Sequence, residues 1–249
     1  MSSNTSICKL CLKHVDLRKS HILPEFLYKP MYDNKHRLFT YTSYDRGTER
    51  PEQKGFRESL LCQSCETKRS KWETYAKQVI FGTAPVRTHD NGEYVAISGI
   101  DYEPFKLFLM SNLWMSGIAS DPFFSMVILG PHEEKLRRML YRGDPGEPKD
   151  YPCLVSGLLC DNQLLTDIIV QPSPARLWSH KCYRFIYCGF LWIYIVTSHR
   201  LSKKCEEAYL DRSGEMSIVL KDSRDMRFLI EAVKDIKKRY DKDGNLLRF

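Results

Sequence analysis

Leu60-Leu61-Cys62-Gln63-Ser64-Cys65-Glu66 contains the strongest motif of this chain, and Cys8-Lys9-Leu10-Cys11 near the start repeats it. Each stretch is a Cys-x-x-Cys knuckle, a tight turn that presents two thiolates to one metal ion. Two knuckles together supply the four sulfur ligands of a tetrahedral structural zinc site. The sequence therefore predicts that zinc is bound by Cys8, Cys11, Cys62 and Cys65. A redox pair and a set of unrelated buried cysteines are the alternatives.

The two knuckles lie farther apart than in most zinc sites of this kind, so residues 12–61 form an insert that leaves the metal and returns to it. Within the insert, Ser20-His21-Ile22-Leu23-Pro24 predicts a short strand at Ile22-Leu23. That strand stops at Pro24, because proline has no backbone N–H to donate to a sheet. His21 would then stand at the head of a strand, close to a metal-anchored turn.

Positive charge is concentrated in the cysteine-containing half of the chain. The net charge is +7, and residues 1–90 hold 16 Lys and Arg against 10 Asp and Glu, whereas the rest is nearly neutral. Residues 30–57 interleave basic and aromatic side chains, and they predict a loose hairpin followed by a mobile loop. These features fit a surface that contacts nucleic acid, with phosphates met by cations and bases by aromatic rings. A solvated basic surface is the alternative.

The cysteine content indicates a reducing compartment. The chain has nine cysteines, an odd number, and its polar start lacks the apolar segment of a signal peptide. We therefore expect a cytoplasmic protein whose thiols serve a metal or the core. The longest apolar run, residues 185–197, is too short to span a membrane. The cysteines outside the knuckles are expected to be core thiols: Cys153, Cys160, Cys182, Cys188 and Cys205.

Hydrophobic periodicity predicts four helices. Residues 66–80 carry apolar side chains at helical spacing, with Gly82 and Pro85 after them. Residues 103–118 are apolar on nearly every side, which is typical of a helix at the centre of a core. Residues 131–140 begin with proline and acids and end with bases, matching the helix dipole. Residues 226–236 describe a terminal amphipathic helix.

The second half also predicts strands, at residues 164–170, 183–187, 191–196 and 216–220, because these runs are aromatic or β-branched and bounded by turn residues. Asp90-Asn91-Gly92 predicts a hairpin tip. The expected fold is α+β, with a zinc-stabilised domain at residues 1–90. Residues 91–249 would form a mixed domain of helices and a small antiparallel sheet, with a regulatory, dimerising or partner-binding role.

The order Cys-x-x-Cys, Ser-His-Ile-Leu-Pro, Leu-Leu-Cys-x-x-Cys and helix resembles the HNH endonuclease family over roughly residues 5–80. It is most similar to a bacterial group of HNH-like proteins associated with anti-phage defence. The resemblance implies a ββα-metal fold, a structural zinc and a catalytic divalent cation, Mg²⁺ or Mn²⁺. It also implies that His21 acts as general base on a water molecule.

The chain departs from the family pattern at three positions. Ser20 precedes the strand histidine, Glu66 replaces the helix histidine, and the middle asparagine has no clear counterpart apart from Asn34. Glutamate can bind Mg²⁺ or Mn²⁺, so Glu66 with Glu73 or Glu25 could rebuild a cation site near His21. The alternative for Glu73 is a surface ion pair with Arg69, four residues before it.

The first hypothesis is therefore a metal-dependent HNH-like endonuclease, in which His21 is the base and Glu66 and Glu73 hold the cation. The phosphate backbone of the nucleic acid would be contacted by Arg57, Lys68 and Arg69. DNA is favoured over RNA as that nucleic acid. A second copy of the chain or a defence-system protein would be a further partner. The alternative function is a catalytically degenerate, zinc-containing module that binds nucleic acid or protein.

Overall fold

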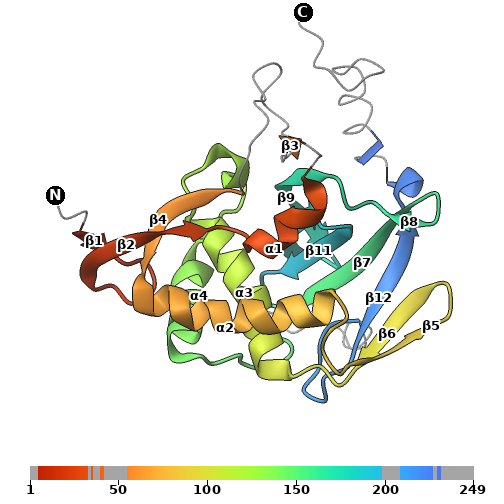
Figure 1. Cartoon of the computed structure of the whole chain (residues 1–249), viewed down its shortest axis with the longest axis horizontal. Helices are drawn as coiled ribbons and strands as arrows, with labels where there is room; N and C mark the ends of the chain where they lie inside the picture. The colour runs from red at the N-terminus through yellow and green to blue at the C-terminus, as the bar shows by residue number, and fades with distance from the viewer. Residues whose placement is uncertain are drawn as a thin grey trace, which may run out of the picture.

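A computed structural model describes residues 5–32, 35, 40–41, 55–197, 208–226 and 229–230 (Figure 1). Within these residues the fold is α+β, with two β-sheets and four α-helices. The small sheet has the strand order β1-β2-β4, and the large sheet has nine strands. No helix in the described residues is long and apolar enough to cross a bilayer.

The small sheet consists of β1 (Thr5–Ile7), β2 (His14–His21) and β4 (Arg57–Cys62). β2 is antiparallel to both neighbours, and its register places His21 opposite Arg57. Helix α2 (Gln63–Ile80) follows β4 directly and packs against β2 and β4. The predicted helix is confirmed, and it starts three residues earlier than expected because the second knuckle forms its first turn.

The predicted strand at Ile22-Leu23 is wrong. β2 ends with His21 as its last residue, and Ile22 and Leu23 lie buried in the bend that follows. Pro24 then leads into the short helix α1 (Glu25–Tyr28) and a 3-10 turn at Lys29–Met31, because the fixed φ of proline suits the start of a helix. His21 therefore stands at the end of a strand, next to a helix start.

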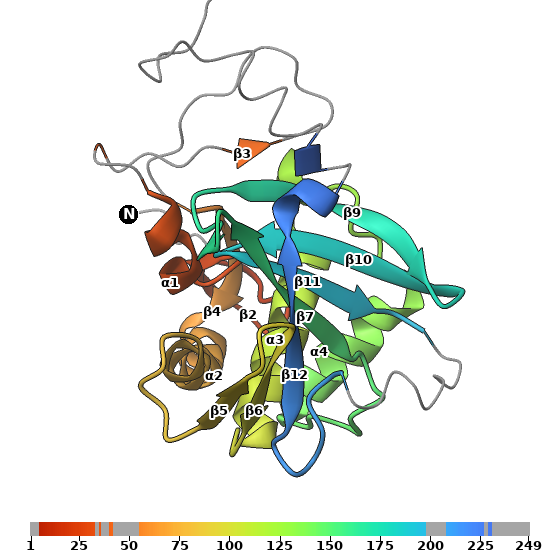
Figure 2. The same cartoon turned by 90° about the vertical axis from the view of Figure 1, so that its right-hand side faces the viewer.

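The large sheet has the order β3-β9-β10-β11-β7-β12-β6-β5, with β8 beside β7 (Figure 2). Its strands are β3 (Thr40–Tyr41), β5 (Arg87–Asp90), β6 (Tyr94–Ser98), β7 (Cys153–Cys160), β8 (Gln163–Leu164), β9 (Ile169–Leu177), β10 (His180–Tyr187), β11 (Phe190–Ile195) and β12 (Met216–Asp222). Most pairs are antiparallel, but β12 is parallel to β7 and β3 to β9. The sheet is thus larger than predicted, and it is mixed.

The predicted hairpin tip is confirmed. Asp90-Asn91-Gly92 joins β5 to β6, and Cys188-Gly189 joins β10 to β11. The predicted strand at 164–170 is divided, because a turn separates β8 from β9. No pattern in the sequence predicted β7, because its buried apolar residues do not alternate with polar ones. Of the predicted terminal helix, Leu229 and Ile230 are helical, while residues 231–236 lie outside the described residues, as does most of 30–57.

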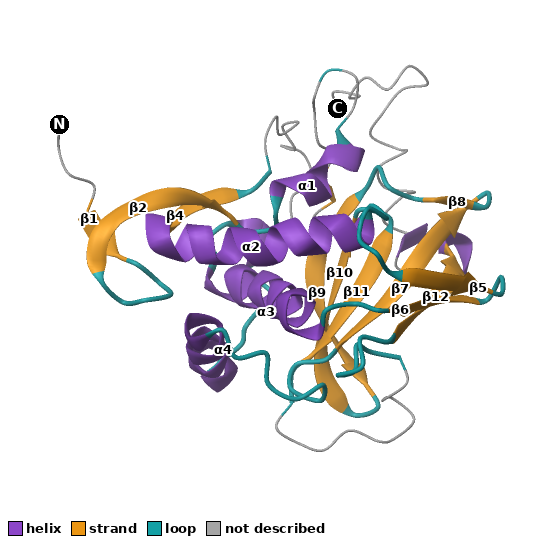
Figure 3. Ribbon diagram, turned by 60° about the horizontal axis from the view of Figure 1, so that its bottom comes forward, coloured by secondary structure: helices purple, strands orange, loops and turns teal. Residues whose placement is uncertain are grey.

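Helix α2 and the next helix along the chain lie between the two sheets (Figure 3). α3 (Tyr102–Ile118) packs against α2 on one side and α4 (Pro131–Arg142) on the other. Nearly every side chain of α3 is buried, which confirms the prediction of a central core helix. α4 begins at Pro131 as predicted and continues to Arg142, where Gly143 in the left-handed conformation caps it.

The main hydrophobic core is continuous across the chain. It runs from Cys8 in the first knuckle to Met216 in the large sheet, and so joins residues on both sides of position 90. Cys153, Cys182 and Cys188 are buried as predicted. The prediction for Cys160 is wrong, since it is exposed at the end of β7, and Cys205 lies outside the described residues.

Candidate metal centre and histidine site

The structure brings together the four predicted cysteines, Cys8, Cys11, Cys62 and Cys65, which we call the four-cysteine cluster. Their Sγ atoms all lie within 4.8 Å of one another, and the Sγ atoms of Cys11 and Cys62 are 3.8 Å apart. A tetrahedral ion with Zn–S bonds of about 2.3 Å requires sulfur atoms about 3.8 Å apart. The four-cysteine cluster could therefore hold a metal ion such as zinc.

Backbone contacts bring the two knuckles together. The N–H of Cys62 donates to Sγ of Cys8 (3.3 Å), and the N–H of Lys9 donates to the carbonyl of Leu60 (2.9 Å). Leu12 closes the first knuckle with a positive φ of 61°. Helix α4 adds a brace, because Nη1 of Arg137 donates to the carbonyl of Leu10 (2.7 Å).

The cluster also favours thiolate at one position. Burial raises the pKa of the Cys62 thiol, but hydrogen bonds from Ser64, from the backbone of Cys65 and from the neighbouring thiols outweigh that effect and lower the pKa to about 6. Burial raises the pKa of Cys65. The thiolate is the metal-binding form, so the lowered pKa of Cys62 favours metal binding at this cysteine.

His21 is oriented by a carboxylate. Its ring Nε2 lies 2.6 Å from Oε2 of Glu25, which is in the first turn of α1. The side chains are 24% and 34% exposed, so solvent or a substrate can reach both. Since a carboxylate accepts hydrogen bonds, Nε2 carries the proton and Nδ1 is left as an acceptor.

Arg57 completes a three-residue group with His21 and Glu25. Its Nη2 donates to Oε2 of Glu25 (3.1 Å), and Tyr32 donates to Oε1 (3.4 Å). Burial is the largest cause that lowers the pKa of His21; the positive charge of Arg57 lowers it further, and Glu25 raises it in part. The lowered pKa favours the neutral form of His21, the form that can accept a proton.

Arg69, expected to contact phosphates, is buried at 2% exposure. Its Nη1 and Nη2 donate to the carbonyls of His21 (2.6 Å) and Ile22 (3.2 Å). Its Nε lies 3.0 Å from Oε1 of Glu73, so the ion pair that was the alternative for Glu73 is the one present. In this conformation Arg69 fixes the end of β2 and has no surface for a nucleic acid.

The other predicted residues lie apart from this group. Neither Glu66 nor Glu73 forms a hydrogen bond or ion pair with His21, and Oε1 of Glu66 is buried without a hydrogen-bond partner. Nζ of Lys68 donates to the carbonyl of Tyr141 on α4. Asn34 lies outside the described residues.

Within the described residues, the four-cysteine cluster is the one group of three or more His, Cys, Asp or Glu side chains gathered as metal ligands. Among the residues that the structure describes, His21 and Glu25 have no third ligand of these types beside them. Mg²⁺ commonly uses only one or two carboxylates and takes substrate phosphate oxygens and water as its remaining ligands. A cation at this site would need such additional ligands.

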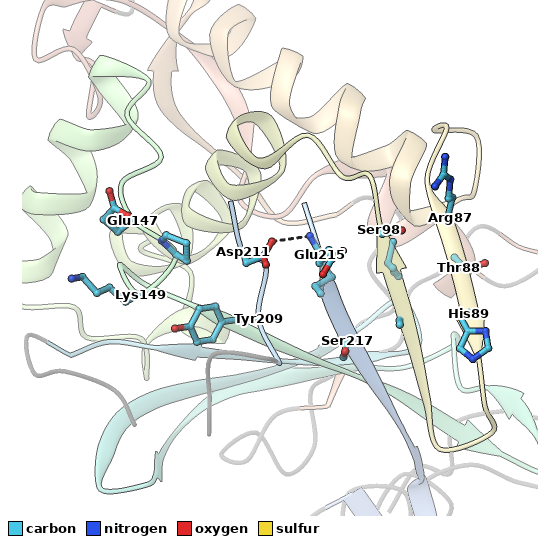
Figure 4. A pocket seen from close by; sticks show the side chains of 14 residues that line it. Arg87, Thr88, His89, Ser98, Glu147, Lys149, Tyr209, Asp211, Glu215 and Ser217 are labelled. Atoms are coloured by element: carbon cyan, nitrogen blue, oxygen red, sulfur yellow. Dashed lines mark hydrogen bonds between the residues drawn. The ribbon is translucent and has the colours of Figure 1, made fainter. Parts of the chain in front are cut away.

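A separate hollow of about 760 Å³ lies where β5, β6 and β12 meet the loops around Lys149 and Asp211 (Figure 4). Two of the three acids at its edge, Glu147 and Asp211, are engaged within the protein. Glu147 is paired with Arg212 (2.8 Å), and Asp211 accepts the N–H of Glu215 (3.0 Å). Neither His21 nor the four-cysteine cluster lines this hollow, and no motif in the sequence pointed to it.

Sequence reasoning found His21 and the cysteines but did not identify the role of Arg57 or the burial of Arg69. The spacing of His21 and Glu25, four residues apart across a strand-to-helix junction, is the signal that could have indicated their contact. No family model, curated protein or solved structure matches the chain.

Proposed function

We propose that this protein is an HNH-like endonuclease that hydrolyses phosphodiester bonds, with DNA as its substrate. The observation that supports the proposal is the group formed by His21, Glu25 and Arg57. It places a neutral, carboxylate-oriented histidine beside a guanidinium at a partly exposed strand end. The excess of Lys and Arg in residues 1–90 supports a polyanionic partner.

In the proposed reaction, Nδ1 of His21 takes a proton from a water molecule, and the resulting hydroxide attacks the phosphorus. Glu25 keeps the ring in the required tautomer and stabilises the imidazolium that forms. Arg57 lies where its positive charge can stabilise the phosphate oxygens as negative charge develops. The bond from phosphorus to the leaving oxygen breaks, and that oxygen takes a proton from solvent.

Two metal ions belong to the proposal. We assign zinc to the four-cysteine cluster as a structural ion, because four gathered thiolates are the ligand set of such sites. The HNH resemblance adds a catalytic Mg²⁺ or Mn²⁺, which would supply Lewis-acid stabilisation of the scissile phosphate. Oε1 of Glu66 is buried without a hydrogen-bond partner and is not joined to His21, so such an ion would take its remaining ligands from substrate phosphate oxygens and water. The resemblance also suggests an effector role in anti-phage defence, with a second copy or a defence protein as partner.

The alternative is a zinc-containing binding module without catalysis. It is favoured by one observation: no third metal ligand stands beside His21 and Glu25 in the described chain. Under this alternative Arg57 and the basic half would bind nucleic acid, or the surface would bind a protein, without any bond being cut.

The two functions are separated by incubating the full-length protein with supercoiled plasmid, linear duplex, single-stranded DNA and RNA, with Mg²⁺ or Mn²⁺ present. We expect cleavage of DNA. Retention of all four substrates as intact complexes, at full zinc content, would favour the binding module instead. Salt-dependent binding alone supports neither function over the other, because it follows from charge.

A further inference from the structure

Arg57 lies between two residues that are fixed to the same distant segment. That segment, residues 119–124, follows α3 and contains the 3-10 turn η2 (Pro122–Phe124). Phe56 and Glu58, on either side of Arg57, both contact it. Because successive residues of a strand point to opposite faces, anchoring these two neighbours directs Arg57 to the other face, where Glu25 lies.

Glu58 makes the polar part of this attachment. Its two carboxylate oxygens accept the N–H of Ser120 (2.9 and 3.0 Å), the hydroxyl of Ser120 and the N–H of Asp121 (2.9 Å). Hydrogen bonds to a charged carboxylate are stronger than those between neutral groups. A carboxylate that accepts this many hydrogen bonds has little freedom to rotate.

Phe56 makes the apolar part. Its ring stacks on Phe123 with centroids 4.5 Å apart, and it meets Phe124 edge to face at 5.3 Å. Both partner rings are almost fully buried. The start of β4 is therefore held by packing on one side of Arg57 and by hydrogen bonds on the other.

The segment at residues 119–124 is itself held by the large sheet. Asp121 accepts the N–H of Phe123 (2.9 Å), which closes η2, and Nε2 of Gln171 on β9 donates to the carbonyl of Pro122 (3.4 Å). A continuous set of contacts thus runs from β9 through η2 to Glu58 and the start of β4. These contacts connect residues after position 90 to the group of His21, Glu25 and Arg57.

We propose that Glu58 is a positioning residue, which holds Arg57 against Glu25 and thereby sets the environment of His21. This inference rests on the proposed function for its consequence in catalysis, but its geometry does not. Among the described residues, the charged groups that face His21 are Glu25 from α1, Arg57 from β4 and Arg69 from α2. Of these three, Arg57 is the one that lies next to Glu58 in β4, so its position depends on how Glu58 is anchored.

The test is the pKa of His21, measured by NMR on the full-length, zinc-loaded chain carrying Glu58→Gln. The two effects of this substitution have opposite signs. Removing a carboxylate near His21 lowers the pKa of the ring, because it destabilises the imidazolium, whereas release of Arg57 raises it. We expect the pKa to rise. Glu93→Gln, at the exposed tip of the β5–β6 hairpin, is the matched control and should leave the pKa unchanged.

A pKa of His21 that falls or stays constant in Glu58→Gln would overturn the proposal. If Arg57 is the intermediary, Glu58→Gln should cause no rise in an Arg57→Gln background, and a rise there would also overturn it. Should Glu58→Gln not fold, Ser120→Ala decides, since it removes one hydrogen bond without changing charge. It should give a smaller rise, and no rise counts against the proposal. These pKa shifts do not require catalysis, so they would also be measured in a protein without nuclease activity. Failure of the proposed function and failure of this inference can therefore be distinguished.

Discussion

Nε2 of His21 and Oε2 of Glu25 lie 2.6 Å apart, across the junction where β2 ends and α1 begins. This contact assigns the ring proton to Nε2 and leaves Nδ1 free to act as a base. Replacing the carboxylate by an amide keeps the size of the side chain but removes the charge that stabilises the imidazolium. We expect Glu25→Gln to fold normally and to cut DNA more slowly by about tenfold to a hundredfold. Equal rates for the variant and the wild type would show that Glu25 does not assist His21.

The rate of cleavage should depend on pH through His21. Burial and Arg57 hold its pKa below the ordinary value of about 6.5. The neutral ring is the active form, so activity should fall only as the pH drops below that value. Arg57→Gln removes a positive charge and should move this acid limb to higher pH, in addition to lowering the rate. A pH–rate profile of both proteins checks this, and an acid limb that moves to lower pH would be inconsistent with the geometry.

The same lowered pKa has a consequence for stability. The unfolded chain binds a proton at His21 at a higher pH than the folded chain does, so the contribution of His21 to folding falls as the pH drops through about 6.5. Denaturant titrations at pH 7.5 and 5.5 should show a smaller loss of stability in His21→Gln than in the wild type. Equal losses would indicate that the ring titrates alike in both states.

Arg69 should matter for stability more than for substrate contact. Its buried guanidinium holds the carbonyls of His21 and Ile22, and removing it leaves those acceptors without their donors. We expect Arg69→Gln to lower the free energy of unfolding by about 2–4 kcal/mol. Arg138→Gln is the control, because Arg138 is an exposed member of a surface ion pair, and its loss should cost less than about 1 kcal/mol. Similar costs for the two variants would contradict the buried role of Arg69.

The four-cysteine cluster should bind one zinc ion per chain, and removal of that ion should unfold the small sheet. Folding and zinc binding are coupled in sites of this type, since the unfolded chain does not hold the four thiolates together. Cys62→Ser should lose zinc and the protection of β2 and β4 against hydrogen exchange. Cys160→Ser, which alters an exposed thiol away from the cluster, should keep both. Full protection in zinc-free Cys62→Ser would refute the structural role.

The elements that could be predicted from sequence are those whose signals are local. The Cys-x-x-Cys knuckles, the turn at Asp90-Asn91-Gly92 and the apolar run of α3 each carry their information within a few residues. β7 has no such signal, because a strand buried on both faces lacks alternation and is identified only by its neighbours β11 and β12. The size and mixed pairing of the large sheet therefore needed the structure.

The residues of the candidate site also divide into those with a local sequence signal and those placed by long-range contacts. His21 and the cysteines stand in recognisable motifs, whereas Arg69 has the sequence context of a surface helix cation and is nevertheless buried beneath β2. Glu58 contacts Ser120, 62 residues later in the chain, and no pattern in either segment indicates that pairing. Long-range contacts of this kind decide which charged residues reach a substrate and which hold the scaffold.

The most direct measurement is nicking of supercoiled plasmid in Mg²⁺ or Mn²⁺ by three full-length proteins with equal zinc content: wild type, His21→Ala and His89→Ala. His89 is an exposed histidine on β5, so its variant controls for the loss of an imidazole away from the site. We expect the wild type and His89→Ala to nick the plasmid and His21→Ala to lose activity by at least about a hundredfold. Equal nicking by all three proteins would exclude His21 as the base, and the absence of nicking by any of them under either cation would contradict the endonuclease function.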